Sequence, residues 1–330
     1  MKERLLRYLA CPECSGGLQL KNVVKDGPEI KEGLLYCACG SSFIIKDYIP
    51  RFVDSDGYLS SFSFEWKIHS RTQLDSANKG KAMEGVSERN FSKRVDFPLV
   101  DLKGKMVLDA GCGMGRFSEI AAKYGAEVIG LDLSQAVDVA MKNVGFQDSV
   151  HLIQADIFKL PLRQDMFDFI FSFGVLHHTP DCARAFGMLP KLLKKNGKIS
   201  IFVYSSYNKG IVYISGFWRF FTTRLPRRIL YLVSYISVPL YYFYKIPILG
   251  SIAKLLFVIP MWPDWRWRVL DTFDWYSPKY QSKHTYPEVF GWFRQAGLRQ
   301  LMLYEPPVAV RGTRDSQVTL GPSEVPGSGH

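Results

Sequence analysis

Residues 107–117 read Val-Leu-Asp-Ala-Gly-Cys-Gly-Met-Gly-Arg-Phe. Their apolar start predicts a strand at 106–110, and a helical pattern over 117–124 follows the glycines. Glycine lets the backbone pass close to a bound molecule just before a helix begins. The segment therefore indicates a strand, a ligand-binding loop and a helix of an α/β sheet.

Short apolar runs alternate with helical patterns on the C-terminal side of this loop. They predict a helix over about 181–195 and strands at 127–131, 151–155, 167–173 and 198–204. Such alternation indicates a Rossmann-like, doubly wound α/β sheet. Ligands bind beyond the carboxyl ends of the strands in such sheets, where we expect Asp109, Asp132 and Asp156.

The spacing of the glycines distinguishes two cofactors. A dinucleotide-binding loop has the pattern G-x-G-x-x-G, whereas the third glycine here is Gly115, and Arg116 stands at the dinucleotide position. The carboxylate of Asp109 would repel a pyrophosphate but suits a cofactor that carries a cationic amino group. A NAD-dependent oxidoreductase, which would bind a dinucleotide, is the alternative from another class of enzyme.

The motifs of this region resemble those of class I S-adenosylmethionine-dependent methyltransferases. The resemblance covers roughly residues 105–204 and rests on segments in the family's order and spacing, namely 107–117, 130–134, 154–156, 167–178 and 192–198. It implies a seven-stranded sheet, S-adenosylmethionine as the cofactor and direct transfer of its methyl group. A non-catalytic protein that keeps the cofactor fold is another interpretation, and it predicts cofactor binding without turnover.

The same resemblance implies a set of cofactor-binding residues. The glycine loop and Phe173 would line the methionine part of the cofactor. Asp132 would accept hydrogen bonds from the ribose hydroxyls, and Asp156 would accept one from the adenine amino group. Capping of helices or turns is the alternative role of these aspartates. The predicted set is Asp109, Gly111, Cys112, Gly113, Gly115, Asp132, Leu133, Asp156, Ile157 and Phe173.

Two adjacent histidines, His177 and His178, follow a predicted strand end beside the expected methyl group. A hydroxyl nucleophile reacts faster when a base takes its proton, and histidine is suited to that task near neutral pH. We predict that this pair supplies the catalytic base, with His178 preferred. The alternative is that one or both imidazoles pack at the start of the next helix.

Two close pairs of cysteines, Cys11 with Cys14 and Cys37 with Cys39, lie within residues 1–52. Four thiolates so spaced suit a tetrahedral zinc ion, although C-x-C replaces the usual second C-x₂-C. This module also resembles the small zinc-ribbon activator of tRNA and protein methyltransferases, which implies a structural zinc. Buried cysteines in a metal-free β-ribbon are the alternative. A net charge of only +2 over 1–52 makes a nucleic-acid surface unfavourable.

Residues 205–263 carry seven basic residues and no acidic one, and 14 of these 59 residues are aromatic. Their longest uncharged run, 229–244, contains Pro239 and has 16 residues, whereas a membrane-spanning helix needs about 20 apolar residues. We predict a helical lid that also contacts an anionic membrane. A lid without membrane contact and a homodimer interface are the alternatives. Nucleic acid is a less favourable partner, because many aliphatic residues accompany the aromatic ones.

The other segments surround this core. Residues 53–100 are predicted to form an N-terminal lid or linker, in which Arg71 and Gln73 contact the cofactor. A methyltransferase-like domain over 101–311 would end in two antiparallel strands, 298–304 and 308–311, before a disordered Gly/Pro/Ser-rich tail at 312–330. Thr285 and Glu288 predict a capping box. Further residues that could face the substrate are Asp274, Tyr276 and His284.

Composition narrows the class of protein. The 330 residues are 47% hydrophobic and 22% charged, which excludes a disordered chain, and six cysteines are too few for a disulfide-stapled fold. Charges interrupt residues 1–7, so we expect a cytoplasmic protein, peripheral at the inner face of the membrane where the insert binds it. The predicted activity is O-methylation of a small, glycosylated or lipid-linked acceptor. Methylation of tRNA or rRNA is the alternative.

Overall fold

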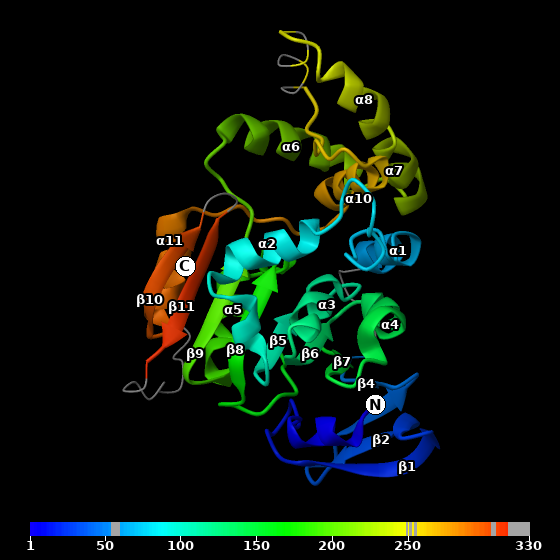
Figure 1. The fold of residues 1–330 in the computed structure, drawn as a ribbon, viewed down its shortest axis with the longest axis vertical. Helices are drawn as coiled ribbons and strands as arrows, with labels where there is room; N and C mark the ends of the chain where they lie inside the picture. Colours follow the sequence, from blue (N-terminus) through cyan, green and yellow to red (C-terminus); the bar gives the residue numbers. More distant parts are fainter. Residues whose placement is uncertain (54–59, 249, 251–252, 254–255, 305–307, 316–330) are drawn as a thin grey trace.

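The computed structural model describes residues 1–53, 60–248, 250, 253, 256–304 and 308–315. Within them one mixed sheet runs in the order β1-β2-β3-β4-β7-β6-β5-β8-β9-β11-β10. Helix α2 crosses in front of this sheet in Figure 1, and α11 lies behind β10 and β11. The strands are β1 (Leu18–Asp26), β2 (Glu29–Cys37), β3 (Ser42–Lys46), β4 (Ile49–Arg51), β5 (Met106–Ala110), β6 (Glu127–Asp132), β7 (Val150–Gln154), β8 (Phe167–Phe173), β9 (Leu193–Phe202), β10 (Leu298–Tyr304) and β11 (Ala309–Arg314).

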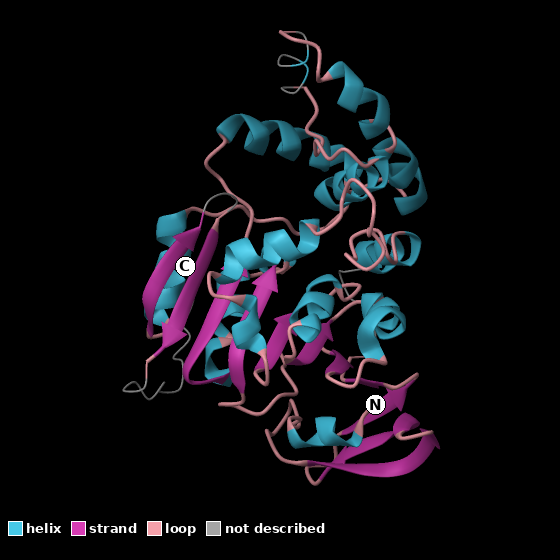
Figure 2. Cartoon of the chain, viewed as in Figure 1, coloured by secondary structure: helices cyan, strands magenta, loops and turns pink. Residues whose placement is uncertain are grey.

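Figure 2 separates these strands from the helices by colour. The α-helices are α1 (Ser60–Ile68), α2 (Val86–Val95), α3 (Arg116–Lys123), α4 (Ala136–Ala140), α5 (Cys182–Gly187), α6 (Lys209–Thr222), α7 (Arg227–Ser234), α8 (Ser237–Phe243), α10 (Trp265–Tyr276) and α11 (Tyr286–Gln295). A π-helical turn at Met141–Gly145 continues α4, and short 3₁₀ turns lie at Glu3–Arg7, Leu99–Leu102, Leu176–His178 and Pro190–Leu192.

Strands β5 to β9 form the parallel centre of the sheet. All five residues of β7 are buried, as expected for a strand with both faces covered. Strands β10 and β11 close the sheet as an antiparallel pair, and β10 spans the predicted range 298–304. These features confirm the Rossmann-like α/β fold.

The prediction of seven strands is wrong for the sheet as a whole. Strands β5 to β11 make up those seven, but β4 runs parallel to β7 and adds the four N-terminal strands to the same sheet. The Phe52 N–H donates to the Gln154 carbonyl (2.8 Å), and Arg51 forms a salt bridge with Asp138 (2.5 Å). An unpaired edge strand exposes a row of N–H and C=O groups, and β4 covers part of that row. The cysteine module also shares its apolar core with the sheet.

The predicted helix over 181–195 is too long. Helix α5 ends at Gly187, a 3₁₀ turn follows at Pro190–Leu192, and β9 already begins at Leu193. The pairing of β8 with β9 is irregular before Lys198, and Asn196 has a positive φ of 62° inside that irregularity. A Cβ on Gly197 would lie 2.9 Å from two backbone oxygens, so the strand passes this point only with glycine.

The predicted disordered tail begins too early. Strand β11 continues to Arg314, and Gly312 and Thr313 pair with Ile199 and Lys198 of β9. Residues 312–314 therefore belong to the sheet, because β9 is long enough to pair with them. Positions 316–330 lie outside the described residues, as do 249, 251–252 and 254–255 of the predicted insert.

Helices α6, α7, α8 and α10 gather beyond the end of the sheet toward which the central arrows point (Figure 1). Asn208 accepts a hydrogen bond from the Ile211 N–H and begins α6, and Asp264 begins α10 in the same way. The predicted capping box of Thr285 and Glu288 is present at α11. Among the described residues, none of the helices is both long and apolar enough to cross a membrane.

Candidate active site

A cavity of about 1010 Å³ lies at the carboxyl ends of β5, β6, β8 and β9. The glycine loop forms one side of it, and α1, α2 and α10 contribute other walls. Residues at the start of α6 and the segment Val258–Trp262 complete the lining. The predicted insert and the 53–100 segment thus both reach the place where an α/β sheet binds its ligands.

The glycine loop is held in a form that only glycine adopts readily. Gly111 has a φ of 96°, and a Cβ there would lie 2.4 Å from Val175 Cγ1. The N–H groups of Gly111 and Cys112 donate to the Leu131 carbonyl, which ties the loop to β6. The backbone of residues 111–114 can therefore border the cavity directly.

Asp132, at the end of β6, lies beside this loop and lines the cavity. Its Oδ2 accepts a hydrogen bond from the Gly113 N–H (2.8 Å), and its Oδ1 accepts two from Ser134. The carboxylate thus braces the glycine loop and the turn into α4. The alternative role, capping, is therefore present, and the predicted role in ligand binding stays a prediction for a residue that lines the cavity.

The structure brings together half of the predicted cofactor residues, namely Gly111, Cys112, Gly113, Asp132 and Phe173. The others do not line the cavity; they are Asp109, Gly115, Leu133, Asp156 and Ile157. Asp109 is 3% exposed and accepts a hydrogen bond from Ser118, and burial raises the pKa of its carboxyl to about 7. Asp156 caps a turn by accepting from the Phe158 N–H (2.9 Å).

The two histidines have different surroundings. His178 lines the cavity, whereas His177 is fully buried behind it and stacks on Tyr204, with ring centroids 3.9 Å apart. Nδ1 of His178 lies 3.0 Å from the Tyr280 carbonyl, so this nitrogen carries the proton. Burial lowers the pKa of His178 to about 4 and that of His177 well below its usual value. Both rings are thus neutral at pH 7.

Nε2 of His178 is consequently an unprotonated lone-pair acceptor, and it is buried in a residue that lines the cavity. No described residue donates a hydrogen bond to it. A buried acceptor without a donor carries a cost in free energy, which a ligand hydroxyl would remove. Only one imidazole of the predicted pair is therefore placed to receive a proton from a bound molecule.

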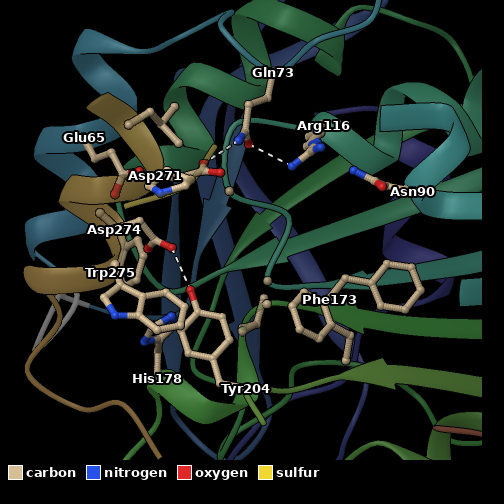
Figure 3. Close-up of a pocket in the computed structure, with 18 of the residues that line it drawn as sticks. Glu65, Gln73, Asn90, Arg116, Phe173, His178, Tyr204, Asp271, Asp274 and Trp275 are labelled. Atoms are coloured by element: carbon tan, nitrogen blue, oxygen red, sulfur yellow. Dashed lines mark hydrogen bonds between the residues drawn. The ribbon is translucent and has the colours of Figure 1, made fainter. Parts of the chain in front are cut away.

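Three carboxyl groups form an acidic wall on one side of the cavity (Figure 3), and they are Glu65, Asp271 and Asp274. Asp271 and Asp274 lie three residues apart on α10, so they share a face of the helix. The Tyr204 hydroxyl donates to Asp274 (3.1 Å). No described residue donates to either oxygen of Glu65.

Burial and mutual repulsion keep this wall partly protonated. Burial, reinforced by Asp274 and Asp271, raises the pKa of Glu65 well above its usual value. Burial also raises the pKa of Asp271 to about 6 and that of Asp274 to about 7. At pH 7 Asp271 is mostly ionised and accepts hydrogen bonds, whereas Glu65 and Asp274 can also donate them, and a wall of this kind favours a cationic or hydroxyl-rich ligand.

A polar chain connects the acidic wall to the glycine loop. Gln73 donates to Asp271 (2.9 Å) and accepts from Arg116 (3.0 Å), whose guanidinium also bonds Ser87. Burial lowers the pKa of Arg116 to about 10, so it remains charged. Gln73, predicted as a contact, lines the cavity, and Arg71 does not. The wall is thus held in place from α3 and the segment before α2.

Sequence reasoning missed Glu65 and Asp271. Of the three candidates proposed for the substrate, only Asp274 lines the cavity. The Tyr276 hydroxyl bonds Val258, and His284 bonds Glu288 and Ser282. The available signal was an acidic residue inside an otherwise aromatic run, Ser61 to Trp66, and a three-residue spacing of acids in the pattern over 265–276.

Replacing Asp274 by asparagine should flatten the pH dependence of stability. The folded-state pKa of about 7 lies above the unfolded value near 3.8, so the wild type loses unfolding free energy as pH rises from about 4 to 7. The slope is about 1.4 kcal/mol per pH unit for one proton. Relative to wild type, the variant should gain stability between pH 5 and pH 8, measured by urea unfolding. If the free energy of unfolding changed with pH equally in the two proteins, the raised pKa of Asp274 would be contradicted.

Four cysteine sulfurs form a compact cluster in the N-terminal module. The Sγ atoms of Cys11, Cys14, Cys37 and Cys39 all lie within 4.8 Å of one another, and Cys14 and Cys37 are 3.4 Å apart. Zinc–sulfur bonds of about 2.3 Å in a tetrahedron place sulfurs about 3.8 Å apart. The cluster therefore fits a zinc ion. Cys112 and Cys182 lie elsewhere, in the glycine loop and in α5.

The centre of the chain is similar to a known protein family. Residues 108–201 match a family model described as a methyltransferase domain. This part runs from β5 to β9 and includes the glycine loop, Asp132 and His178. The centre of the chain is therefore similar to methyltransferase domains.

Named relatives match part of the chain. The ubiquinone biosynthesis O-methyltransferase of Coxiella burnetii is 38% identical over 102 residues, which cover 30% of this chain and 44% of that protein. The malonyl-(acyl-carrier protein) O-methyltransferase of Legionella pneumophila is 30% identical over 134 residues, or 40% of this chain and 46% of that protein. The chain thus spans less than half the length of these relatives.

A solved structure is similar over a longer range. A chain from the complex between the Haloferax volcanii Trm112 methyltransferase activator and a methyltransferase aligns with 78% of this chain and 100% of its own length. Its sequence identity is 14% and the TM-score is 0.45.

Proposed function

We propose that this protein is an S-adenosylmethionine-dependent methyltransferase that methylates a hydroxyl group of a small acceptor. The observation that carries the proposal is the neutral His178, which lines the cavity and whose buried Nε2 has no donor among the described residues. The methyltransferase-domain match over 108–201 and the names of the relatives support it.

The cavity suits a cofactor that is a cation. Asp132 offers acceptors for hydroxyl groups beside the glycine loop, and the acidic wall suits a positive charge. A pyrophosphate would meet the carboxylate of Asp132 beside the glycine loop, which disfavours the NAD-dependent alternative. When bound, S-adenosylmethionine supplies a methyl group activated by its sulfonium.

The chain's own residues align the acceptor and take its proton. The acceptor oxygen forms a bond to the methyl carbon as the carbon–sulfur bond breaks, and Nε2 of His178 receives the hydroxyl proton. Tyr280 holds the imidazole in the tautomer that leaves Nε2 unprotonated. Phe62, whose ring centroid lies 5.1 Å from that of His178, helps exclude water from the proton-accepting nitrogen. Alignment and exclusion of water supply most of the rate enhancement.

Labelled S-adenosylmethionine tests this proposal. The purified protein should bind the cofactor by calorimetry and should transfer label from the methyl group to a component of a cell extract. The transferred label should resist mild base, which releases methanol from methyl esters, and should be released by reagents that cleave methyl ethers. Cofactor binding without any transfer would instead favour a non-catalytic protein, and nicotinamide dinucleotide binding would contradict the assignment.

We further propose that the four cysteines bind a structural zinc ion. Replacing Cys37 by serine should lower the zinc content from about one ion per chain and reduce the melting temperature, because folding of such modules depends on the metal. Elemental analysis and thermal unfolding measure the two effects. Cys182→Ser, a buried cysteine outside the cluster, should keep its zinc. If elemental analysis found no metal in the wild-type protein, the proposed zinc site would be contradicted.

A further inference from the structure

The outer face of α6 is aromatic. Tyr213, Phe217, Phe220 and Phe221 are between 50% and 74% exposed, and their spacing of four, three and one residues places them along one side of the helix. The Phe217 and Phe221 rings are in edge contact, with centroids 5.4 Å apart. Exposed aromatic side chains of this density on one helix indicate a surface that binds a partner.

Helices α7 and α8, which pack on α10 as α6 does, also expose apolar side chains. Ile229, Leu232, Val233 and Ile236 follow the helical spacing i, i+3, i+4 and i+7, and each is at least 40% exposed. On α8, Tyr242 is 65% exposed. We call the outward residues of α6, α7 and α8 the insert surface, and its most exposed members include Tyr213, Phe217, Phe220, Phe221, Leu232 and Tyr242.

The inner faces of the same helices bury polar residues beside the apolar Leu230 and the aromatic Tyr241 and Tyr244. Ser215 and Thr222 of α6 are buried, and the Thr222 hydroxyl donates to the Tyr276 carbonyl. Arg219 turns inward to donate to the carbonyls of Trp275 and Pro278. Ser234 and Ser237 are buried beneath α7 and α8. Large apolar side chains thus remain exposed on the outer face while hydroxyl-bearing residues are buried, and an apolar environment would cover those exposed side chains.

The charge around this surface identifies its partner. Lys209, Arg224, Arg228 and Lys245 are exposed, and residues 205–263 contain no acidic residue. Arg224 lies over the Phe220 ring at 4.1 Å. A second copy of the chain would bring these positive charges together across a twofold axis, which is unfavourable. An anionic lipid surface complements both the charge and the apolar side chains.

The lengths of the helices indicate how they would meet a bilayer. Helix α6 has 14 residues and is about 21 Å long at 1.5 Å per residue. The hydrocarbon core of a bilayer is about 30 Å thick. These helices would therefore lie in the interface, with the aromatic rings at the level of the headgroups.

The insert surface and the cavity share α6. Ile211 and Asn208, at the start of this helix, line the cavity, while Phe217 and Phe220 lie further along its outer face. An acceptor that enters past α6 therefore comes from the side of the molecule that carries the insert surface.

We propose that the insert surface docks the protein on an anionic lipid bilayer, and that the cavity takes the head of a membrane-resident, hydroxyl-bearing amphiphile. The first statement stands on the insert surface alone. The second rests on the proposed function, because it names the class of acceptor for the same site.

Sedimentation with vesicles tests the docking. The full-length protein should bind vesicles of phosphatidylglycerol and phosphatidylcholine, bind pure phosphatidylcholine at least tenfold more weakly, and dissociate as salt is raised. A surface variant combines Phe217→Ser, Phe220→Ser and Leu232→Ser. A matched control combines Ile44→Ser, Val100→Ser and Phe146→Ser, which are exposed apolar residues elsewhere. The surface variant should bind at least tenfold more weakly, and the control should bind like wild type.

Several outcomes would overturn the docking. In the first the wild type fails to bind anionic vesicles, and in the second the surface and control variants lose binding equally. In the others the wild type forms a dimer that is absent in the surface variant, or it binds RNA and no vesicles. The assay needs no cofactor, so His178→Gln should bind vesicles like wild type even if the proposed activity is wrong. For the acceptor, label from S-adenosylmethionine should enter the organic-soluble fraction of membranes. Label confined to aqueous small molecules would overturn that second statement.

Discussion

Replacing His178 by glutamine is expected to slow methyl transfer by about a hundredfold to ten-thousandfold, the range that loss of a general base produces. The amide has no lone pair that can take a proton at neutral pH, although it can still bond the Tyr280 carbonyl. Cofactor affinity should remain close to that of wild type, because Nε2 serves the acceptor. Single-turnover transfer of labelled methyl, beside calorimetric binding of S-adenosylmethionine, separates the two quantities.

His284→Gln is the matched control, since His284 lies outside the cavity lining and bonds Glu288 and Ser282. Its transfer rate should stay within severalfold of wild type. Because burial lowers the pKa of His178 to about 4, the wild-type rate should not fall between pH 8 and pH 6 through protonation of this ring. An undiminished rate in His178→Gln would remove the histidine from the mechanism and leave proton acceptance to the acidic wall.

Replacing Asp132 by alanine is expected to weaken binding of S-adenosylmethionine by about a hundredfold or more. Hydrogen bonds to a charged group contribute about 1.5–3 kcal/mol each, and two such bonds to the ribose hydroxyls are proposed. The variant also loses the acceptor that holds the Gly113 N–H, so the glycine loop becomes less ordered. Calorimetric titration with S-adenosylmethionine measures the loss.

Asp132→Asn keeps one of the two acceptors, so its amide oxygen can still accept from the Gly113 N–H while its NH2 group faces the Ser134 N–H. It should melt between the wild type and Asp132→Ala, and it should bind the cofactor more weakly than the wild type. Asp101→Ala changes an exposed aspartate outside the cavity and should leave affinity unchanged. Wild-type affinity in Asp132→Ala would show that the cofactor lies elsewhere.

The centre of the fold was predictable because its signals are local. The strand, glycines and helix of residues 106–123 follow one another within a short stretch, and the aspartate at the end of β6 has a fixed place in the same pattern. The eleven-stranded sheet was not predictable, because the pairing of Arg51 with Gln154 joins strands that are about a hundred residues apart and rests on a single backbone register.

The candidate site likewise has parts that could be predicted from the sequence and parts that could not. Adjacent histidines were visible in the sequence, but only packing decides that His178 lines the cavity while His177 stacks on Tyr204. Glu65 and Asp271 meet from helices about two hundred residues apart, and neither belongs to a motif. The composition of the insert indicated a basic, aromatic element. Which of its residues face inward and which face outward could not be predicted, because that depends on the packing of α6, α7 and α8 against α10.

The pairing of β4 with β7 also determines when the chain can finish folding during its synthesis. The N-terminal strands leave the ribosome first, yet their neighbour in the sheet ends at Gln154. At about 5–20 residues per second, the intervening hundred residues take roughly 5–20 seconds to emerge. The four cysteines, by contrast, all lie within the first 39 residues. Capture of a metal ion by the nascent module would protect its strands during that interval, so zinc supply would influence the yield of folded protein.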